Sequence, residues 1–128
     1  MRYPKLGIGP ARRRLAVLVL AVTMLFAVPA AAQAYWGAIA VNPVTGAYGV
    51  SYNYNTADGA KKRALNECKG QKCRVAVWVR NGYAALVFKP KNGVFVAGAG
   101  DTKKEAFAEA RRRAHDGSAR KVTWVYSG

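Results

Sequence analysis

The chain contains one histidine, His115, and Asp116 follows it directly. An imidazole beside a carboxylate is a combination that can act as a general base. The same position also fits the last turn of a helix, where a positive side chain interacts favourably with the helix dipole. No serine lies in the Gly-x-Ser-x-Gly context of a hydrolase nucleophile. We therefore interpret His115 as a solvated residue at a helix end, with a general base as the alternative.

The acidic residues do not form a recognisable catalytic pair. Glu109 and Arg113 are spaced i,i+4, which predicts an ion pair on a helix surface. Gly98-Ala99-Gly100 resembles part of a phosphate loop but lacks the Gly-Lys-Ser/Thr that follows one, so a tight strand-to-helix turn is expected there. Nothing favours the carboxylate pair of a glycosidase. The six acidic residues are Asp58, Glu67, Asp101, Glu105, Glu109 and Asp116.

The two cysteines, Cys68 and Cys73, are separated by four residues. With no further cysteine and a single histidine, they are too few to predict a metal site, and no metal or cofactor is expected. In an exported protein the pair predicts a disulfide. A loop this short would stabilise the fold by about 2 kcal/mol through the unfolded chain.

Residues 1–34 have the pattern of a signal peptide. A basic segment that includes Arg12-Arg13-Arg14 precedes the apolar run Leu15–Val28. That run is about 14 residues, or ~21 Å of helix, whereas a bilayer core is ~30 Å thick. Small residues at Ala32 and Ala34 predict cleavage after Ala34, and hence a secreted protein without a membrane-spanning segment. An uncleaved anchor is one alternative, and a twin-arginine signal, which the very apolar run disfavours, is another.

Strong positive charge characterises the remaining segment, Tyr35–Gly128. The chain has 21 Lys and Arg against 6 acidic residues; five of the basic and none of the acidic residues lie in residues 1–34, which leaves a net charge of about +10. Such a charge predicts an anionic partner, with solubility alone as the alternative. The candidate anion-binding residues are Lys61, Lys62, Arg63, Lys69, Lys72, Arg74, Arg111, Arg112, Arg113, Arg120 and Lys121.

Two halves of the chain are similar in sequence. The segment Gly37–Gly46 aligns with Ala84–Gly93, 47 positions later, and both segments end in a Pro-x-x-Gly turn. After a one-residue deletion the offset becomes 46, which pairs Trp78 with Trp124. This periodicity predicts a duplicated unit. The expected domain covers residues 35–128, with repeat units of about 35–81 and 82–128.

Each unit has the pattern strand, turn, strand, helix, strand. Apolar residues at period two predict the strands, and Tyr48, Val50, Tyr52 and Tyr54 are expected on one face. Threonine N-caps and alanine stripes predict the helices, with a capping box at Thr102. The predicted elements are strands Trp36–Asn42, Ala47–Tyr54, Arg74–Arg80, Tyr83–Phe88, Val94–Ala99 and Val122–Tyr126, and helices at Ala57–Cys68 and from Thr102.

The fold class that follows is α+β. Because neither β-β-α-β unit can bury a core alone, the duplicated units are expected to pack two helices against a shared antiparallel sheet.

The residues Tyr35-Trp36-Gly37-Ala38-Ile39-Ala40, followed by Gly46, Thr56, Ala60, Ala64-Leu65-x-x-Cys68 and Cys73-Arg74-Val75, resemble the secreted family called domain of unknown function 4189 (DUF4189). The resemblance covers nearly all of residues 35–128 and implies an exported, actinobacterial type of protein with this duplicated fold. It implies no activity, because the family has no established catalytic residues. Relatives usually have a second cysteine pair, whose positions here hold Tyr83 and Tyr126, and an aromatic contact is expected to replace that bond.

Together these features predict a secreted, monomeric domain that binds rather than catalyses. The expected partner is an anionic cell-envelope polymer, an anionic lipid surface, nucleic acid or an acidic protein. A small secreted hydrolase or toxin that uses His115 or a carboxylate pair is the first alternative. A protein inhibitor or host-interaction factor that uses a loop such as Lys69–Lys72 is the second.

Overall fold

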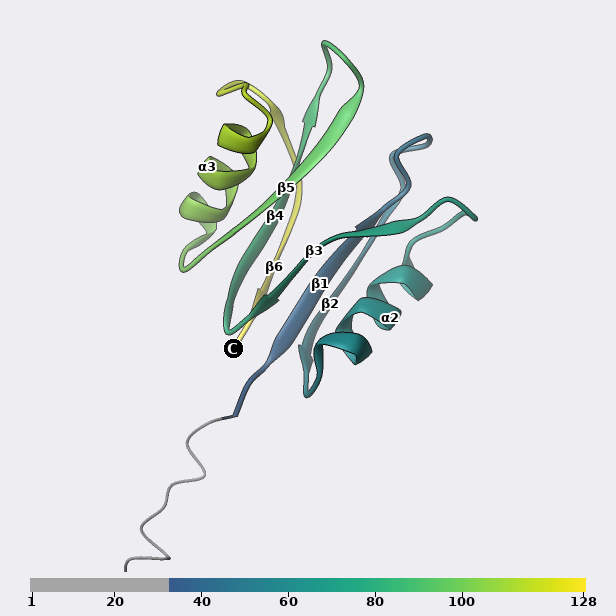
Figure 1. Ribbon diagram of the computed structural model, residues 1–128, viewed down its shortest axis with the longest axis vertical. Coiled ribbons are helices and arrows are strands. Elements are labelled where there is room, and N and C mark those ends of the chain that lie inside the picture. The colour runs from purple at the N-terminus through teal and green to yellow at the C-terminus, as the bar shows by residue number, and fades with distance from the viewer. Residues whose placement is uncertain (1–32) are drawn as a thin grey trace, which may run out of the picture. The chain divides into compact units, whose positions relative to one another are not determined.

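The computed structural model describes residues 33–128, so the predicted signal segment lies outside the described residues except for Gln33 and Ala34. All described elements belong to one compact unit, Ala34–Gly128. The order strand, strand, helix, strand occurs twice, as predicted (Figure 1). The elements are β1 (Trp36–Val41), β2 (Tyr48–Tyr54), α2 (Ala57–Glu67), β3 (Arg74–Arg80), β4 (Gly82–Lys89), β5 (Val94–Gly100), α3 (Lys103–Arg113) and β6 (Arg120–Ser127).

The strands form two antiparallel sheets rather than the single shared sheet expected from the sequence. One has the order β2-β1-β3 and the other β5-β4-β6. The sheets pack face to face, with α2 outside the first and α3 outside the second (Figure 1). The physical reason is that both faces of each sheet carry apolar side chains. A helix covers one face, and the other sheet covers the second face.

Three clusters of buried residues match these layers. The central cluster lies between the sheets and includes Ile39 and Leu86, which are both fully buried. The outer clusters consist mainly of alanines. Ala60 and Ala64 of α2 pack on β1, whereas Ala106 and Ala110 of α3 pack on β4. Because alanine side chains are short, each helix lies close to its sheet.

Threonine side chains start both helices. Thr56 accepts a hydrogen bond from the Gly59 N–H at 3.0 Å, and Thr102 accepts one from the Glu105 N–H at 3.1 Å. The Glu105 carboxylate in turn accepts from the Asp101 N–H. These contacts satisfy N–H groups that have no partner within the helix. Within residues 33–128, neither helix is long and apolar enough to cross a membrane.

A bulge in β2 changes one expected face. Asn53 has a φ of 59°, and the pairing shifts so that Tyr54 lies opposite Trp36 while Ser51 lies opposite Ala38. An extra residue reverses the side-chain alternation of a strand. Tyr54 therefore packs with the α2 cluster, while Val50 packs between the sheets. The expectation that Tyr54 shares a face with Val50 is wrong for this reason.

Two predicted contacts within the halves are present. A disulfide joins Cys68 to Cys73 across the connection between α2 and β3. In the second half, Tyr83 and Tyr126 are cross-strand partners, and their ring centroids are 4.6 Å apart. The aromatic contact expected in place of a second disulfide therefore forms.

Candidate functional site

The basic residues of α2 lie on the outer face of one sheet, and most of them contact other side chains. The Nζ of Lys61 lies 3.4 Å from a carboxylate oxygen of Asp58 and 4.5 Å from the centroid of the Trp78 ring. Arg63 is 2.8 Å from Glu67. Lys62 is exposed. Intrahelical ion pairs of this kind are weak, but they reduce the positive charge that α2 presents to a partner.

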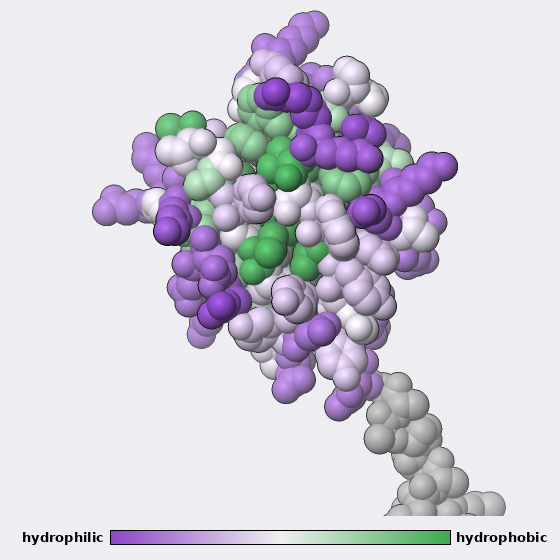
Figure 2. All heavy atoms as spheres, turned by 180° about the vertical axis from the view of Figure 1, so that it is seen from behind, coloured by the Kyte–Doolittle hydropathy of each residue, from purple (hydrophilic) through white to green (hydrophobic). Residues whose placement is uncertain are grey.

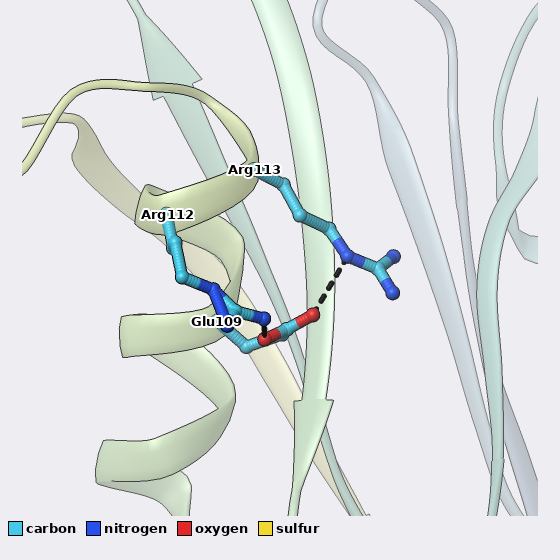
Figure 3. Close-up of polar contacts among 3 residues, drawn as sticks. All are labelled: Glu109, Arg112 and Arg113. Carbon is cyan, nitrogen blue, oxygen red and sulfur yellow. Dashed lines mark hydrogen bonds and ion pairs between the residues drawn. The ribbon is translucent and has the colours of Figure 1, made fainter.

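The arginines of α3 lie on the opposite outer layer and also have partners. The Glu109 carboxylate, which is only 21% exposed, binds both Arg112 and Arg113 (Figure 3). The Arg113 contact is the predicted i,i+4 pair, at 2.8 Å. The Nε of Arg111 donates to the backbone oxygen of Ala119 at 3.0 Å. The two helical runs are therefore separated by both sheets and do not form one patch.

The loops bring other basic residues together at one end of the domain. A Cβ placed on Gly70, in the disulfide loop, would lie 2.5 Å from the side chain of Asn42, at the β1–β2 turn. A Cβ on Gly46, in that turn, would lie 3.3 Å from the ring of Phe95, where β5 begins. The two hairpin turns and the two helix-to-strand connections thus share one end, uppermost in Figure 1.

We call this region the basic end. It is defined by seven residues: Lys69, Lys72, Arg74, Lys89, Lys91, Arg120 and Lys121. All except the half-buried Lys89 are exposed. The nearby acidic residues are Asp116 and Glu67, and Glu67 is paired with Arg63. The end therefore has a strong excess of positive charge.

The opposite end of the domain is nearly balanced in charge. It contains the connections from β2 to α2, from β3 to β4 and from β5 to α3. The charged side chains at these connections and in the first helical turns are Arg80, Lys103, Lys104, Asp58, Asp101 and Glu105. Of the two ends, only the basic end therefore carries an excess of positive charge, and the remaining excess lies on α2 and α3.

A shallow depression of about 360 Å³ lies at the basic end. Its lining consists of Phe88, Phe95, Val122, Arg120 and Lys121. The rings of Phe88 and Phe95 are 4.8 Å apart, and the Arg120 guanidinium lies 5.3 Å from the Phe88 centroid. The depression thus combines an apolar floor with a cationic rim.

Asp116 is held as a carboxylate at the edge of the basic end. Hydrogen bonds from the Ser118 hydroxyl and backbone N–H, at 2.7 and 2.9 Å, lower the pKa of Asp116 below its ordinary value of 3.8. The positive charges of Lys89 and Lys91 lower this pKa further. Asp116 therefore fixes the connection from α3 to β6 and offsets part of the local positive charge.

Two residues of the basic end, Lys89 and Lys91, are absent from the sequence-derived candidates. The duplicated Pro-x-x-Gly turn contained a signal for Lys91, because the alignment places it opposite Val44 in the first turn. Lys89 is positioned by its hydrogen bond to the Ala114 carbonyl, at 3.0 Å. That contact joins residues 25 positions apart and has no sequence pattern of its own.

In the described residues, His115 and two of the serines have structural rather than catalytic surroundings. His115 is exposed, has a φ of 53° and closes α3 through its backbone N–H bond to Arg112. Within residues 33–128, no hydrogen bond joins its imidazole to a hydroxyl or carboxylate. Ser51 donates to the Ala60 carbonyl, and Ser127 accepts from the Asn53 N–H, so these hydroxyls have structural partners. Over the described part of the chain, no three His, Cys, Asp or Glu residues are grouped to hold a metal ion.

Comparison with known proteins agrees with this fold. The NMR structure of Rv1813c from Mycobacterium tuberculosis is similar, with a TM-score of 0.58 and 27% sequence identity over 77% of this chain and 80% of that chain. A search of curated proteins found no match. Residues 36–127 match the family described as domain of unknown function (DUF4189). The matched residues include every strand and helix from β1 to β6. The chain therefore belongs to the DUF4189 family.

Proposed function

We propose that this chain is an exported, non-catalytic binding domain whose basic end takes an anionic partner. The observation that supports the proposal is the contrast between the two ends: seven cationic side chains gather at one, whereas charges are nearly balanced at the other. Gathering like charges is unfavourable for the fold, and a polyanion would relieve that repulsion while it releases its own counterions.

Export is part of the proposal. The basic and apolar pattern of residues 1–34 and the Cys68–Cys73 disulfide both support it, since disulfides persist in oxidising compartments. A binding role rather than catalysis is supported by the shallow, cation-rimmed surface and by the exposed, unsupported position of His115.

The test measures binding to a simple polyanion, inorganic polyphosphate. Residues 34–128 contain all three buried clusters, so the polypeptide Tyr35–Gly128 carries its own core and is used alone. We would compare the basic-end variant Lys69→Gln/Lys72→Gln/Lys91→Gln with a control of equal charge, Lys62→Gln/Lys103→Gln/Lys104→Gln. Each affinity is measured over a range of salt concentrations.

We expect the basic-end variant to lose about tenfold or more in affinity and to lower the slope of log K against log salt by roughly 2. The control should change affinity by less than about threefold, because its three lysines are not part of the basic end and act on a ligand there only at long range. If the parent domain binds neither polyphosphate nor vesicles of anionic lipid, even at low salt, the proposal fails. Equal losses in both variants would mean that the basic end is not the binding site.

A further inference from the structure

The β1–β2 turn presents an apolar side chain at the basic end. Val44 is 73% exposed. The turn that carries it is rigid, because the buried Asn42 side chain accepts hydrogen bonds from the N–H groups of Val44 and Thr45, at 3.0 and 3.3 Å. The Gly46 N–H also bonds to the Asn42 carbonyl at 2.8 Å. These hydrogen bonds fix the backbone of the turn, and the Val44 side chain therefore extends into solvent.

The β4–β5 hairpin adds a second apolar side chain at the same end. Val94 is 41% exposed and directly precedes Phe95, whose ring lines the depression. The Gly93 N–H bonds to the Lys89 carbonyl at 2.9 Å and closes this turn. The Gly46 turn approaches the Phe95 ring, so the first turn borders the depression. Val94 lies at the same end but on the other face of β5, because neighbouring residues of a strand point to opposite faces.

Basic residues lie at the same end as these apolar groups. Lys91 lies in the second turn, and Arg120 and Lys121 form the rim of the depression. In the upper part of Figure 2, apolar side chains lie among long hydrophilic ones that extend outward. A hydrophilic polyanion, such as a nucleic acid backbone or polyphosphate, would contact the cations and leave the valines without a complementary surface.

We propose that the basic end docks on the surface of an anionic lipid bilayer. Val44 and Val94 enter the headgroup region, and the surrounding lysines and arginines contact lipid phosphates. An anionic bilayer supplies both an apolar layer and negative charge, which is the combination that interfacial proteins use. This inference rests on the proposed function, since it names the anionic partner of the same end.

The experiment measures co-flotation of Tyr35–Gly128 with vesicles of equal phosphatidylglycerol and phosphatidylcholine, and with phosphatidylcholine alone. The parent domain should bind the anionic vesicles and not the neutral ones. Val44→Ser/Val94→Ser should lose about tenfold in vesicle affinity, as expected when two valines leave an apolar environment. Its affinity for polyphosphate should stay within about twofold, because every cation remains.

Two controls separate the possible causes. Val44→Leu/Val94→Leu keeps the apolar groups and should bind the anionic vesicles at least as well as the parent. The variant Lys69→Gln/Lys72→Gln/Lys91→Gln should lose both vesicle and polyphosphate binding. Circular dichroism checks that each variant is folded, and the exposure of both valines makes this the expected result.

The outcomes distinguish the inference from the function on which it rests. If the parent binds polyphosphate but not anionic vesicles, the lipid inference is overturned and the proposed function stands. If it binds neither, both fail. If the serine variant binds vesicles like the parent while the glutamine variant does not, the contact is purely electrostatic and insertion of the valines is overturned.

Discussion

The two halves of the domain close the same connection in different ways. In the first half, the disulfide between Cys68 and Cys73 joins the end of α2 to the start of β3. In the second half, the corresponding residues, 46 positions later, are the buried Ala114 and Ala119. Their carbonyls accept hydrogen bonds from Lys89 Nζ and Arg111 Nε, both at 3.0 Å.

Because of this difference, some positive side chains of the domain have structural roles. One half fixes its helix end covalently, and the other half uses two positive side chains for the same purpose. Lys89 and Arg111 are partly structural, as are the arginines that bind Glu109. Other cations stay available to a partner, among them the exposed Lys69, Lys72 and Lys91 of the disulfide loop and the hairpin turn.

The largest effect is expected where each helix lies on its sheet. A Cβ on Gly49 would overlap the backbone of α2 at Ala64, and one on Gly98 would overlap the backbone of α3 at Ala110. We expect Gly49→Ala and Gly98→Ala each to lower the free energy of unfolding by about 3 kcal/mol, measured by urea denaturation. Gly117→Ala is the control, because nothing lies within 4 Å of its added Cβ.

Equal losses would show that both halves have the same tight fit between helix and strand. A loss below about 1 kcal/mol at one glycine would show that its helix can move outward, and would contradict the close packing there.

The disulfide should have the next largest effect. Reducing it, or replacing both residues in Cys68→Ala/Cys73→Ala, should lower the free energy of unfolding by about 2 kcal/mol, because the unfolded chain regains the freedom of a short loop. Urea denaturation with and without reductant measures this loss. The double alanine variant should not respond to reductant, and any response would mean that the reductant acts elsewhere.

Smaller effects are expected from the cations of the second half. Lys89→Met and Arg111→Met keep an apolar stem but remove the donors to Ala114 and Ala119, so each should lower the free energy of unfolding by about 1 kcal/mol. Thermal denaturation measures both variants. Lys91→Met, at an exposed turn position, is the matched control. If it destabilises as much as Lys89→Met, general charge rather than the hydrogen bonds controls the connection.

The smallest effect concerns Asp116 and pH. Its pKa is lowered in the folded state, so its carboxylate stabilises the fold above the ordinary value of 3.8, and this contribution is lost as pH falls through the lowered folded pKa. Asp116→Ala should therefore be less stable than the parent at neutral pH, and the difference should shrink below pH 3.8. An NMR titration that places the Asp116 pKa at or above 3.8 would contradict the hydrogen bonds from Ser118.

Sequence patterns located the elements well. The strand Arg74–Arg80 has the predicted bounds, and the Thr102 cap begins α3 as expected. Such features depend on contacts between near neighbours, namely side-chain alternation and N–H groups three residues away. Alternation cannot show an extra residue, so the Asn53 bulge and the position of Tyr54 were missed. The candidate site was predicted only in part. The sequence shows which residues are basic, but it does not show which carboxylates and carbonyls bind them in the folded domain.

By itself, the sequence determined the order of elements and the excess of positive charge, and it predicted the disulfide; the contact between Tyr83 and Tyr126 was expected from the family resemblance. Only the tertiary structure decided that the sheets are two, that Arg112 and Arg113 share Glu109, and that turns 47 positions apart meet at one end. The physical reason is that an apolar face predicts that the face is buried but does not show which element packs against it. Which surfaces meet, and which charges remain free, follows from packing between segments distant in the chain.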